Sequence, residues 1–342
     1  MLIINGDIKN FNRKIEAFYN LLINILNKYN KYLLVYHADC DGIVSAIQIY
    51  NFLSQKNLKI NLFGVAQFRN DEYNQIIKIK ENQQYIIFLE GYGMSNEYKI
   101  FNDIALNIDH HPIQNIITNF LNPREFHISP NPANALLVYE LLKNNIDERY
   151  KEWVALASIM DYCEEAAENL LAEIKFVDEE LIELKNIFYA IQYNNEWCNY
   201  VIKKLNKYYT FKEFIKDEKL QRQKIKYLDF YNKHFNAAQN TINPKSKILF
   251  YSLEKSQFRI ASSLANRLSD LYADKIIIIA ELDNERARLS VRNRTYNCNI
   301  GEYLKQLCEQ LKNADATGHE KAASARINKE DINYIIKKIE EI

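Results

Sequence analysis

Short apolar runs that alternate with helical patterns constrain the fold of this chain most strongly. Residues 32–36 (YLLVY), 58–63, 85–89 (YIIFL) and 104–108 are each typical of a buried strand, and apolar groups recur at helical spacing over residues 8–29, 43–53 and 70–80. Strands that alternate with helices predict a parallel sheet with helices on both faces. Ligands of such sheets bind at the carboxyl ends of the strands, so the residues that directly follow these strands are the first candidates for a functional site.

Three regions follow one another along the 342 residues. Residues 1–172 end with helical patterns at 133–144 and 150–170 and form a predicted first α/β domain. Residues 173–242 are helical with almost no helix breakers and predict a connector. Residues 243–342 predict a smaller α/β domain, with strands at 247–251, 275–281, 286–292 and 322–327, helices at 258–273, 300–311 and 329–341, and a loop around Gly318.

Composition excludes several classes of protein. Apolar residues make up 48% of the chain, which excludes wholesale disorder. The five cysteines are scattered without a CxxC pair, so we expect neither a disulfide framework nor a structural zinc site. We find no membrane-length apolar run and no secretory signal, and we expect a cytoplasmic protein. Lys plus Arg equals Asp plus Glu at 44 each, so a nucleic-acid surface would have to come from local segregation of charge.

The segment HADCDG at 37–42 holds the densest group of potential metal ligands. His37, Asp39 and Asp41 alternate after a predicted strand, and alternate side chains of an extended chain share a face. An imidazole and two carboxylates suit a divalent ion such as Mn²⁺ or Mg²⁺. Gly42 would let the backbone turn closely and start a helix, whose N-terminus favours phosphate. A plain Asp-Gly turn with helix-capping side chains explains this segment equally well.

Further candidates follow the next two strands and a later helix. Glu90 follows residues 85–89, and Asp109-His110-His111-Pro112 follows residues 104–108. Adjacent histidines are unusual in a chain with six, and Pro112 favours an extended conformation at His111. The alternative is a pair of surface histidines. Asp161, predicted within the second helix, is a weak candidate by itself.

Taken together, these motifs resemble the DHH phosphoesterase superfamily, which includes RecJ-type single-strand exonucleases, nano-RNases, cyclic-dinucleotide phosphodiesterases and manganese pyrophosphatases. The matching stretches are HADCDG at 37–42, YIIFLEG at 85–91, NIDHHP at 107–112 and SIMD at 158–161. In the last region, RLSVRNR at 288–294 and ATGHEKAAS at 316–324 resemble the arginine-bearing strand and the glycine-rich loop of the DHH-associated domain. The resemblance implies a DHH domain, a connector and a DHH-associated domain, with the active site in the cleft between the two domains.

The resemblance also implies a role for each motif residue with two bound Mn²⁺ ions, or Mg²⁺ in their place. His37 and Asp39 would hold one ion, and Asp41, His110 and Asp161 the other. Glu90, where the family has aspartate, would bridge both ions. Asp109 would orient His110, and His111 would face the scissile phosphate. Substrate phosphates would be bound by residues of the last domain: Arg288, Arg292, Arg294, Gly318 and His319, with His319 closing on the reacting phosphate.

Two basic stretches bear on the substrate. Residues 203–233 carry ten Lys or Arg against four acids, with Tyr208, Tyr209, Tyr227 and Tyr231 interleaved. Basic groups with aromatic stacking platforms suit single-stranded nucleic acid, although an amphipathic helix with buried tyrosines has the same pattern. The arginines at 286, 288, 292 and 294 are spaced to share one face of a strand and predict a second basic patch.

We therefore expect a hydrolase, similar to compact archaeal and bacterial RecJ-like nucleases of DNA repair and replication, that trims single-stranded DNA, RNA or short oligonucleotides from an end. One alternative is a small-molecule phosphodiesterase or phosphatase acting on dinucleotides or nucleotide bisphosphates. The other alternative is a catalytically weak scaffold that binds replication proteins. Glu90, which replaces the aspartate of the family, favours this alternative, and the otherwise intact set of metal ligands opposes it.

Overall fold

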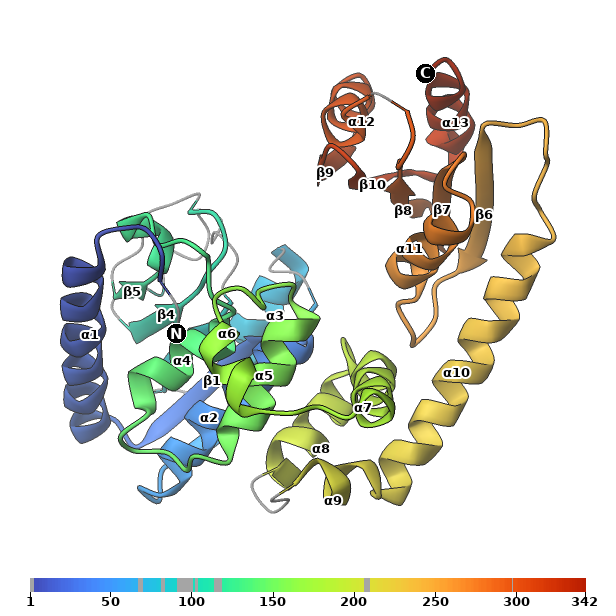
Figure 1. The fold of residues 1–342 in the computed structure, drawn as a ribbon. Helices are drawn as coiled ribbons and strands as arrows, with labels where there is room; N and C mark the ends of the chain where they lie inside the picture. Colours follow the sequence, from blue (N-terminus) through green and yellow to red (C-terminus); the bar gives the residue numbers. More distant parts are fainter. Residues whose placement is uncertain are drawn as a thin grey trace. The chain divides into compact units, whose positions relative to one another are not determined.

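The computed structural model describes residues 3–66, 70–80, 84–90, 101, 104–113, 119–205, 210–296 and 298–342 (Figure 1). These residues form two compact units, Met1–Lys224 (unit 1) and Ile225–Ile342 (unit 2), and each is described by itself. Within the described ranges, no helix is both long and apolar enough to span a membrane.

Unit 1 is built on a five-stranded parallel sheet in the order β2-β1-β3-β4-β5, which confirms the predicted fold class. The strand β5 is only two residues long and no apolar run in the sequence predicted it. The strands and the helices between and before them are α1 (Ile8–Lys28), β1 (Lys31–His37), α2 (Cys40–Ser54), β2 (Lys59–Val65), α3 (Asn70–Ile79), β3 (Tyr85–Leu89), β4 (Ala105–Ile108) and β5 (Phe120–Leu121).

Apolar side chains on both faces of this sheet are buried. Leu34 and Tyr36 of β1 pack in one core with residues of α1, α2, α4 (Asn134–Leu142) and α5 (Tyr150–Met160). The alternate residues Leu33 and Val35 pack in another core that includes Ile76 of α3. Helices therefore cover both faces, and the ends of the strands are the part of the sheet open to a ligand.

Helix α5 ends earlier than the sequence pattern predicts. The chain leaves the helix at Asp161, the C-cap residue, and Tyr162 adopts a left-handed conformation with φ +57°. The N–H of Cys163 then bonds the carbonyl oxygen of Ser158, and the N–H of Tyr162 bonds that of Ile159, which together form a Schellman motif. Asp161 is therefore at a helix end and not within a helix over 150–170, because the apolar pattern does not reveal a left-handed turn made without glycine.

The predicted helical connector is a series of helices. After α6 (Glu168–Glu173) come α7 (Asp178–Ile191), α8 (Asn195–Leu205), α9 (Phe211–Ile215) and α10 (Glu218–Gln239), and the boundary between the two units falls within α10. Trp153 of α5 is fully buried and lies edge-on to Phe211 and Phe214, so α9 packs on the core of unit 1.

Unit 2 contains a mixed sheet in the order β6-β7-β8-β10-β9, in which only β6 and β7 are parallel. Ala287, Leu289 and Val291 of β8 face a core that includes residues of α12 and α13, and Arg288 and Arg292 face the other way. Its elements are β6 (Ile248–Glu254), α11 (Ala261–Leu271), β7 (Ile276–Asp283), β8 (Arg286–Arg292), α12 (Ile300–Glu309), β9 (Asp315–His319), β10 (Ala322–Asn328) and α13 (Ile332–Glu340).

Gly318 lies in a strand and not in the predicted loop. It belongs to β9 and pairs with Ala323 of β10. A Cβ atom at position 318 would lie 2.5 Å from the carbonyl oxygen of Ala322. The glycine therefore permits close approach of two strands, a tertiary requirement that a sequence pattern does not distinguish from a loop glycine.

Candidate metal centre

The carboxyl end of the parallel sheet gathers the predicted metal ligands of unit 1. β1 ends at His37, Glu90 follows β3, and Asp109 and His110 follow β4. Because β1, β3 and β4 are neighbours in the sheet, residues at their ends come together.

His37 presents one ring nitrogen to two carboxylates. Its Nδ1 lies 2.7 Å from Asp39 Oδ2 and 3.3 Å from Glu90 Oε2, and its Nε2 lies 3.3 Å from the carbonyl oxygen of Ala66. With a proton on Nε2, donated to Ala66, Nδ1 is the ring atom that can bind a metal ion among these carboxylates. Without an ion, although burial opposes the charge of the ring, Asp39 and Glu90 raise the pKa of His37 and favour a proton on Nδ1. Asp39 also caps α2, where its Oδ1 accepts the N–H of Gly42 at 3.0 Å.

Gly42 and Asp41 show how the chain turns at this point. A Cβ atom at position 42 would lie 2.0 Å from the carbonyl oxygen of His37, so the turn from β1 into α2 requires glycine. Helix α2 already begins at Cys40, and the prediction that His37, Asp39 and Asp41 alternate along an extended chain is therefore wrong at Asp41. A helical turn, which the alternating pattern conceals, carries this side chain toward α4.

Asp41 joins two helix starts. Its Oδ2 accepts the N–H of Asn134 and its Oδ1 the N–H of Ala135, both at 2.7 Å, at the beginning of α4. The positive end of the α4 dipole thus stabilises a buried carboxylate. Asp41 Oδ2 also lies 3.7 Å from His110 Nε2, which places it among the other candidate ligands.

His110 has the same arrangement as His37, with its two nitrogens exchanged. Its Nδ1 lies 2.9 Å from the carbonyl oxygen of Pro132, so a proton there leaves the lone pair on Nε2. That Nε2 lies 3.6 Å from Asp161 Oδ2, in addition to its approach to Asp41. No sequence signal indicated Pro132 as the partner that fixes this ring.

Asp109 contacts the second histidine of the pair through its side chain. Its Oδ1 accepts a hydrogen bond from His111 Nδ1 at 2.9 Å and from the backbone N–H groups of His110 and His111. We predicted that Asp109 orients His110; the structure instead has Asp109 holding His111 and Pro132 holding His110. The reason is that β4 ends at Ile108, and the chain then folds His111 back over Asp109.

Glu90 sits between the two histidine groups in an uncommon backbone conformation. Its φ is +59°, in the left-handed region that non-glycine residues rarely adopt, and its side chain is 1% exposed. One carboxylate oxygen groups with His37 and Asp39, and one groups with His110 and His111. Such a conformation costs of order 1–3 kcal/mol and persists where surrounding structure enforces it, often at a functional site.

Crowded carboxylates dominate the electrostatics of this edge. Burial, reinforced by neighbouring carboxylates, raises the pKa of Asp41 to about 7 and that of Asp161 to about 8. The pKa of Glu90 is raised for the same reasons. Burial and the nearby His111 lower the pKa of His110 to about 4, so His110 is neutral at pH 7. These carboxylates therefore retain protons near neutral pH, and a bound cation would displace these protons and stabilise the ionised carboxylates.

The residues at this edge fit a divalent metal. Among the described residues, His37 Nδ1, His110 Nε2 and Glu90 Oε1 are buried polar atoms without a hydrogen-bond partner, because the close approach of His37 to Asp39 is not aligned as a hydrogen bond. Buried polar atoms are normally satisfied. Imidazole lone pairs directed among carboxylates are the donors that a divalent ion takes in proteins.

The arginines of unit 2 do not form one patch. Arg286 bonds Asn328 and the carbonyl oxygen of Asn313, and Arg292 bonds Asn266 and Ser262 of α11. Arg294 lies beyond β8 and pairs with Asp270. The predicted second basic patch is therefore wrong for these three guanidinium groups, which connect the sheet to its neighbours. The side chain of His319 lies outside what the structure describes.

Two of the four tyrosines named above are buried in unit 2. Tyr227 and Tyr231 are 4% and 8% exposed and contact Phe258 and Phe235, respectively. They are not stacking platforms, and the alternative of an amphipathic helix with buried tyrosines is correct for them. Tyr208 and Tyr209 lie outside the described residues.

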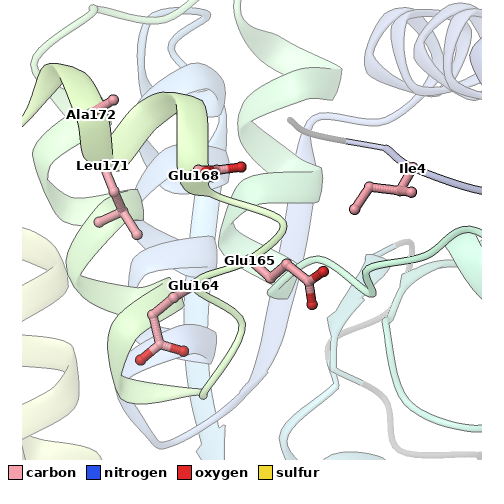
Figure 2. A pocket seen from close by; sticks show the side chains of 6 residues that line it. All are labelled: Ile4, Glu164, Glu165, Glu168, Leu171 and Ala172. Carbon is pink, nitrogen blue, oxygen red and sulfur yellow. The ribbon is translucent and has the colours of Figure 1, made fainter.

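A hollow of about 580 Å³ lies beside the segment that follows Asp161 (Figure 2). Its lining is acidic and apolar, and none of the predicted site residues contributes to it in the described part of the chain. It is therefore separate from the candidate metal centre. It is lined by Ile4, Glu164, Glu165, Glu168, Leu171 and Ala172.

Family comparisons agree with this architecture. Residues 31–163 match the DHH family, N-terminal domain, and residues 245–342 match the DHHA1 domain. The two matches together cover more than half of the chain, and the chain belongs to the DHH phosphoesterase superfamily. No curated protein matches it in sequence.

Solved structures share the fold at low sequence identity. RecJ in complex with Mn²⁺ from Thermus thermophilus matches with a TM-score of 0.73 and 12% identity, over 96% of this chain and 54% of that chain. The pGpG-specific phosphodiesterase PggH from Vibrio cholerae matches with a TM-score of 0.55 and 16% identity, over 91% of this chain and 98% of that chain. CDC45 from Entamoeba histolytica matches with a TM-score of 0.51 and 12% identity, over 96% of this chain and 98% of that chain. This chain thus spans about half the length of the Thermus RecJ.

Proposed function

We propose that this chain is a Mn²⁺- or Mg²⁺-dependent phosphodiesterase that removes nucleotides from an end of single-stranded DNA or RNA, or of short oligonucleotides. The observation that carries the proposal is the pair of buried imidazoles, His37 and His110, each with one nitrogen bonded to a backbone carbonyl and the other directed at carboxylates. A protein that only binds partners has no need of such a donor set.

Two ions would be held by residues already close together. His37 and Asp39 would bind one ion, and Asp41, His110 and Asp161 the other, with Glu90 between them. This assignment is supported by the grouping of His37, Asp39 and Glu90, and by the distances of 3.7 Å and 3.6 Å from His110 Nε2 to Asp41 and Asp161. The bound ions would lower the pKa of a water and neutralise the charge that develops on the reacting phosphate.

His111 would supply or hold a proton at the phosphate. Asp109 keeps the proton of the neutral ring on Nδ1 and would stabilise the imidazolium when Nε2 also gains a proton. Although burial opposes its charge, the bond from His111 lowers the pKa of Asp109, so this carboxylate stays ionised at neutral pH. Arg288, Arg292, Arg294, Gly318 and His319 of unit 2 would bind substrate phosphates, and Arg292 is already oriented by Asn266.

A small-molecule phosphodiesterase acting on dinucleotides is a second candidate. The burial of Tyr227 and Tyr231 and the internal bonds of the unit 2 arginines remove support for a continuous nucleic-acid groove. The PggH structure is that of a pGpG-specific phosphodiesterase, and the match covers 98% of its chain. The alternative of a catalytically weak scaffold is opposed by the donor set.

The test compares three substrates with one protein. The full chain is incubated with Mn²⁺ and end-labelled single-stranded DNA, RNA or a dinucleotide. Stepwise shortening of a polymer from one end supports the nuclease, and cleavage of the dinucleotide alone supports the second candidate. The variant with Asp109→Ala and His110→Ala should lose cleavage, and Glu90→Asp reports whether the extra methylene limits turnover. Absence of Mn²⁺-dependent cleavage of all three substrates would leave only the scaffold.

A further inference from the structure

A thiol lies beside the candidate ligands Asp161 and His110. Cys163 Sγ is 3.4 Å from Asp161 Oδ2, and the ligand atoms of His110, Asp161 and Cys163 all lie within 4.8 Å of one another. The Schellman turn produces this contact, because the left-handed Tyr162 brings the side chains of residues 161 and 163 together at the end of α5.

His110 is the independent indication that a cation belongs at this point. Its side chain is 5% exposed, and its Nε2 has no hydrogen-bond partner in the described part of the chain. This nitrogen is directed at Asp161 Oδ2 and Asp41 Oδ2, at 3.6 Å and 3.7 Å. With the thiol, a nitrogen of His110, an oxygen of Asp161 and the sulfur of Cys163 lie within 4.8 Å of one another, and Asp41 reaches this group through His110.

The separations leave room for an ion that binds both the thiol and its neighbours. The thiol of Cys163 donates to Asp161 Oδ2 at 3.4 Å, and His110 Nε2 lies 3.6 Å from the same oxygen. With Zn–S near 2.3 Å and Zn–N or Zn–O near 2.0 Å, tetrahedral ligands lie about 3.5 Å apart for S and O and about 3.3 Å apart for N and O. An ion that replaces the thiol proton could therefore bind these three atoms with small side-chain movements.

We propose that Cys163 is a thiolate ligand at the metal position of Asp41, His110 and Asp161, and that this position prefers Zn²⁺ or Co²⁺ to Mg²⁺ or Mn²⁺. This inference rests on the metal centre of the proposed function and adds a ligand to it. When the ion binds, the S–H bond breaks, the sulfur–metal bond forms, and the proton leaves to the buffer. The softer thiolate favours the softer ion, whereas His37, Asp39 and Glu90 provide only nitrogen and oxygen.

Cobalt substitution tests this assignment without any substrate. The full chain is stripped of metal with a chelator and titrated with Co²⁺, and the near-ultraviolet sulfur-to-cobalt charge-transfer absorption is recorded. We expect this band in the wild type and in Cys298→Ser, a matched control in unit 2, and its loss in Cys163→Ser. The Zn²⁺ affinity of Cys163→Ser should fall roughly ten- to hundredfold, and its Mn²⁺ affinity, read by electron paramagnetic resonance, should change far less.

Several outcomes would overturn the proposal. They are the absence of the band in the wild type, its persistence in Cys163→Ser, or equal losses of Zn²⁺ and Mn²⁺ affinity in that variant. Alkylation of the wild-type thiol needs no variant: Zn²⁺ should slow labelling of Cys163, measured by peptide mass spectrometry, and Mg²⁺ should not. Equal labelling rates with both ions contradict a thiolate ligand. None of these readouts requires hydrolysis. If the protein does not hydrolyse any substrate, the cobalt band still tests the thiolate ligand, and if the band is absent, the hydrolysis assay still tests the proposed function.

Discussion

The two units differ in how many of their described polar atoms are buried together without a hydrogen-bond partner. At the end of the parallel sheet in unit 1, His37 Nδ1, Glu90 Oε1 and His110 Nε2 are buried and have no aligned hydrogen bond from the described residues. In unit 2, Arg286, Arg292 and Arg294 each bond protein partners, which include residues of α11 and the carbonyl oxygen of Asn313. Nε of Arg286 is the one atom of these three side chains that is buried without a partner among the described residues.

This difference separates a reactive site from a supporting structure. A buried polar atom without a partner costs about 1–3 kcal/mol, and several at one place indicate a site completed by a ligand. Arginines bonded within their own sheet and helix contribute to the position of those elements first. We therefore assign the chemistry to unit 1 and expect unit 2 to contribute mainly to substrate binding.

The largest effect should follow from removal of an unbonded ligand atom. We expect His110→Ala to lower Mn²⁺-dependent hydrolysis roughly a thousandfold, since a bound ion supplies several kcal/mol of transition-state stabilisation. The matched control is His234→Ala, which removes a histidine of unit 2 bonded to Tyr251. Initial rates under saturating Mn²⁺ measure both variants. Equal losses of hydrolysis rate in the two variants would contradict the assignment of the chemistry to unit 1.

Replacement of a glycine by alanine should lower the stability of the protein in either unit, but it should weaken metal binding only in unit 1. Gly42→Ala and Gly318→Ala each force a Cβ against a carbonyl oxygen, at 2.0 Å and 2.5 Å, and each should lower the free energy of unfolding by roughly 1–3 kcal/mol. Only Gly42→Ala displaces His37 and the start of α2. Chemical denaturation measures stability, and Mn²⁺ titration should show weaker binding for Gly42→Ala alone. Unchanged Mn²⁺ binding by Gly42→Ala would contradict the role of the turn.

The metal-free protein should lose stability as the pH rises from about 6.5 to 8.5. In the unfolded chain, aspartates ionise near pH 4, but the pKa values of Asp41 and Asp161 in the folded chain are raised to about 7 and 8. The folded state thus binds more protons in this window, and the stability they contribute disappears as pH passes through 7 and 8, by at most about 1.4 kcal/mol per pH unit for each proton. The raised pKa of His37 acts in the same direction.

Melting temperatures with and without Mn²⁺ measure this effect. Mn²⁺ should raise the melting temperature more at pH 8.5 than at pH 6.5, and Asp161→Asn should flatten the pH dependence of the metal-free protein. A metal-free protein that becomes more stable over this window would show that the carboxylates are not crowded in solution.

The smallest effect is expected on the surface of unit 2. Arg294 and Asp270 form an ion pair whose side chains are 46% and 62% exposed, so Arg294→Ala should cost less than about 1 kcal/mol of stability. Urea denaturation of the full chain measures it. A loss of several kcal/mol would mean that unit 2 depends on its charged residues as strongly as unit 1 does.

Local sequence patterns predicted much of the fold. The strand at residues 85–89 and the strand at residues 286–292 were predicted to the residue, because apolar runs and strict alternation persist over their whole length. The pattern misjudged the end of α5, where Tyr162 takes a conformation usually reserved for glycine. The sequence pattern also predicted an extended conformation at Asp41, because the sequence Asp-Cys-Asp is compatible with both a strand and the first turn of a helix.

The sequence by itself determined which residues meet at the candidate metal centre. Neighbouring parallel strands end at one edge of a sheet, so motifs placed directly after β1, β3 and β4 had to converge. Only the tertiary structure decided which atoms face the ion. The carbonyl groups of Ala66 and Pro132 lie 29 and 22 residues away from the histidines they bond and fix which ring nitrogen keeps its lone pair. The ligand atoms of Cys163 and His110 likewise lie within 4.8 Å of each other although 53 residues separate them in the chain.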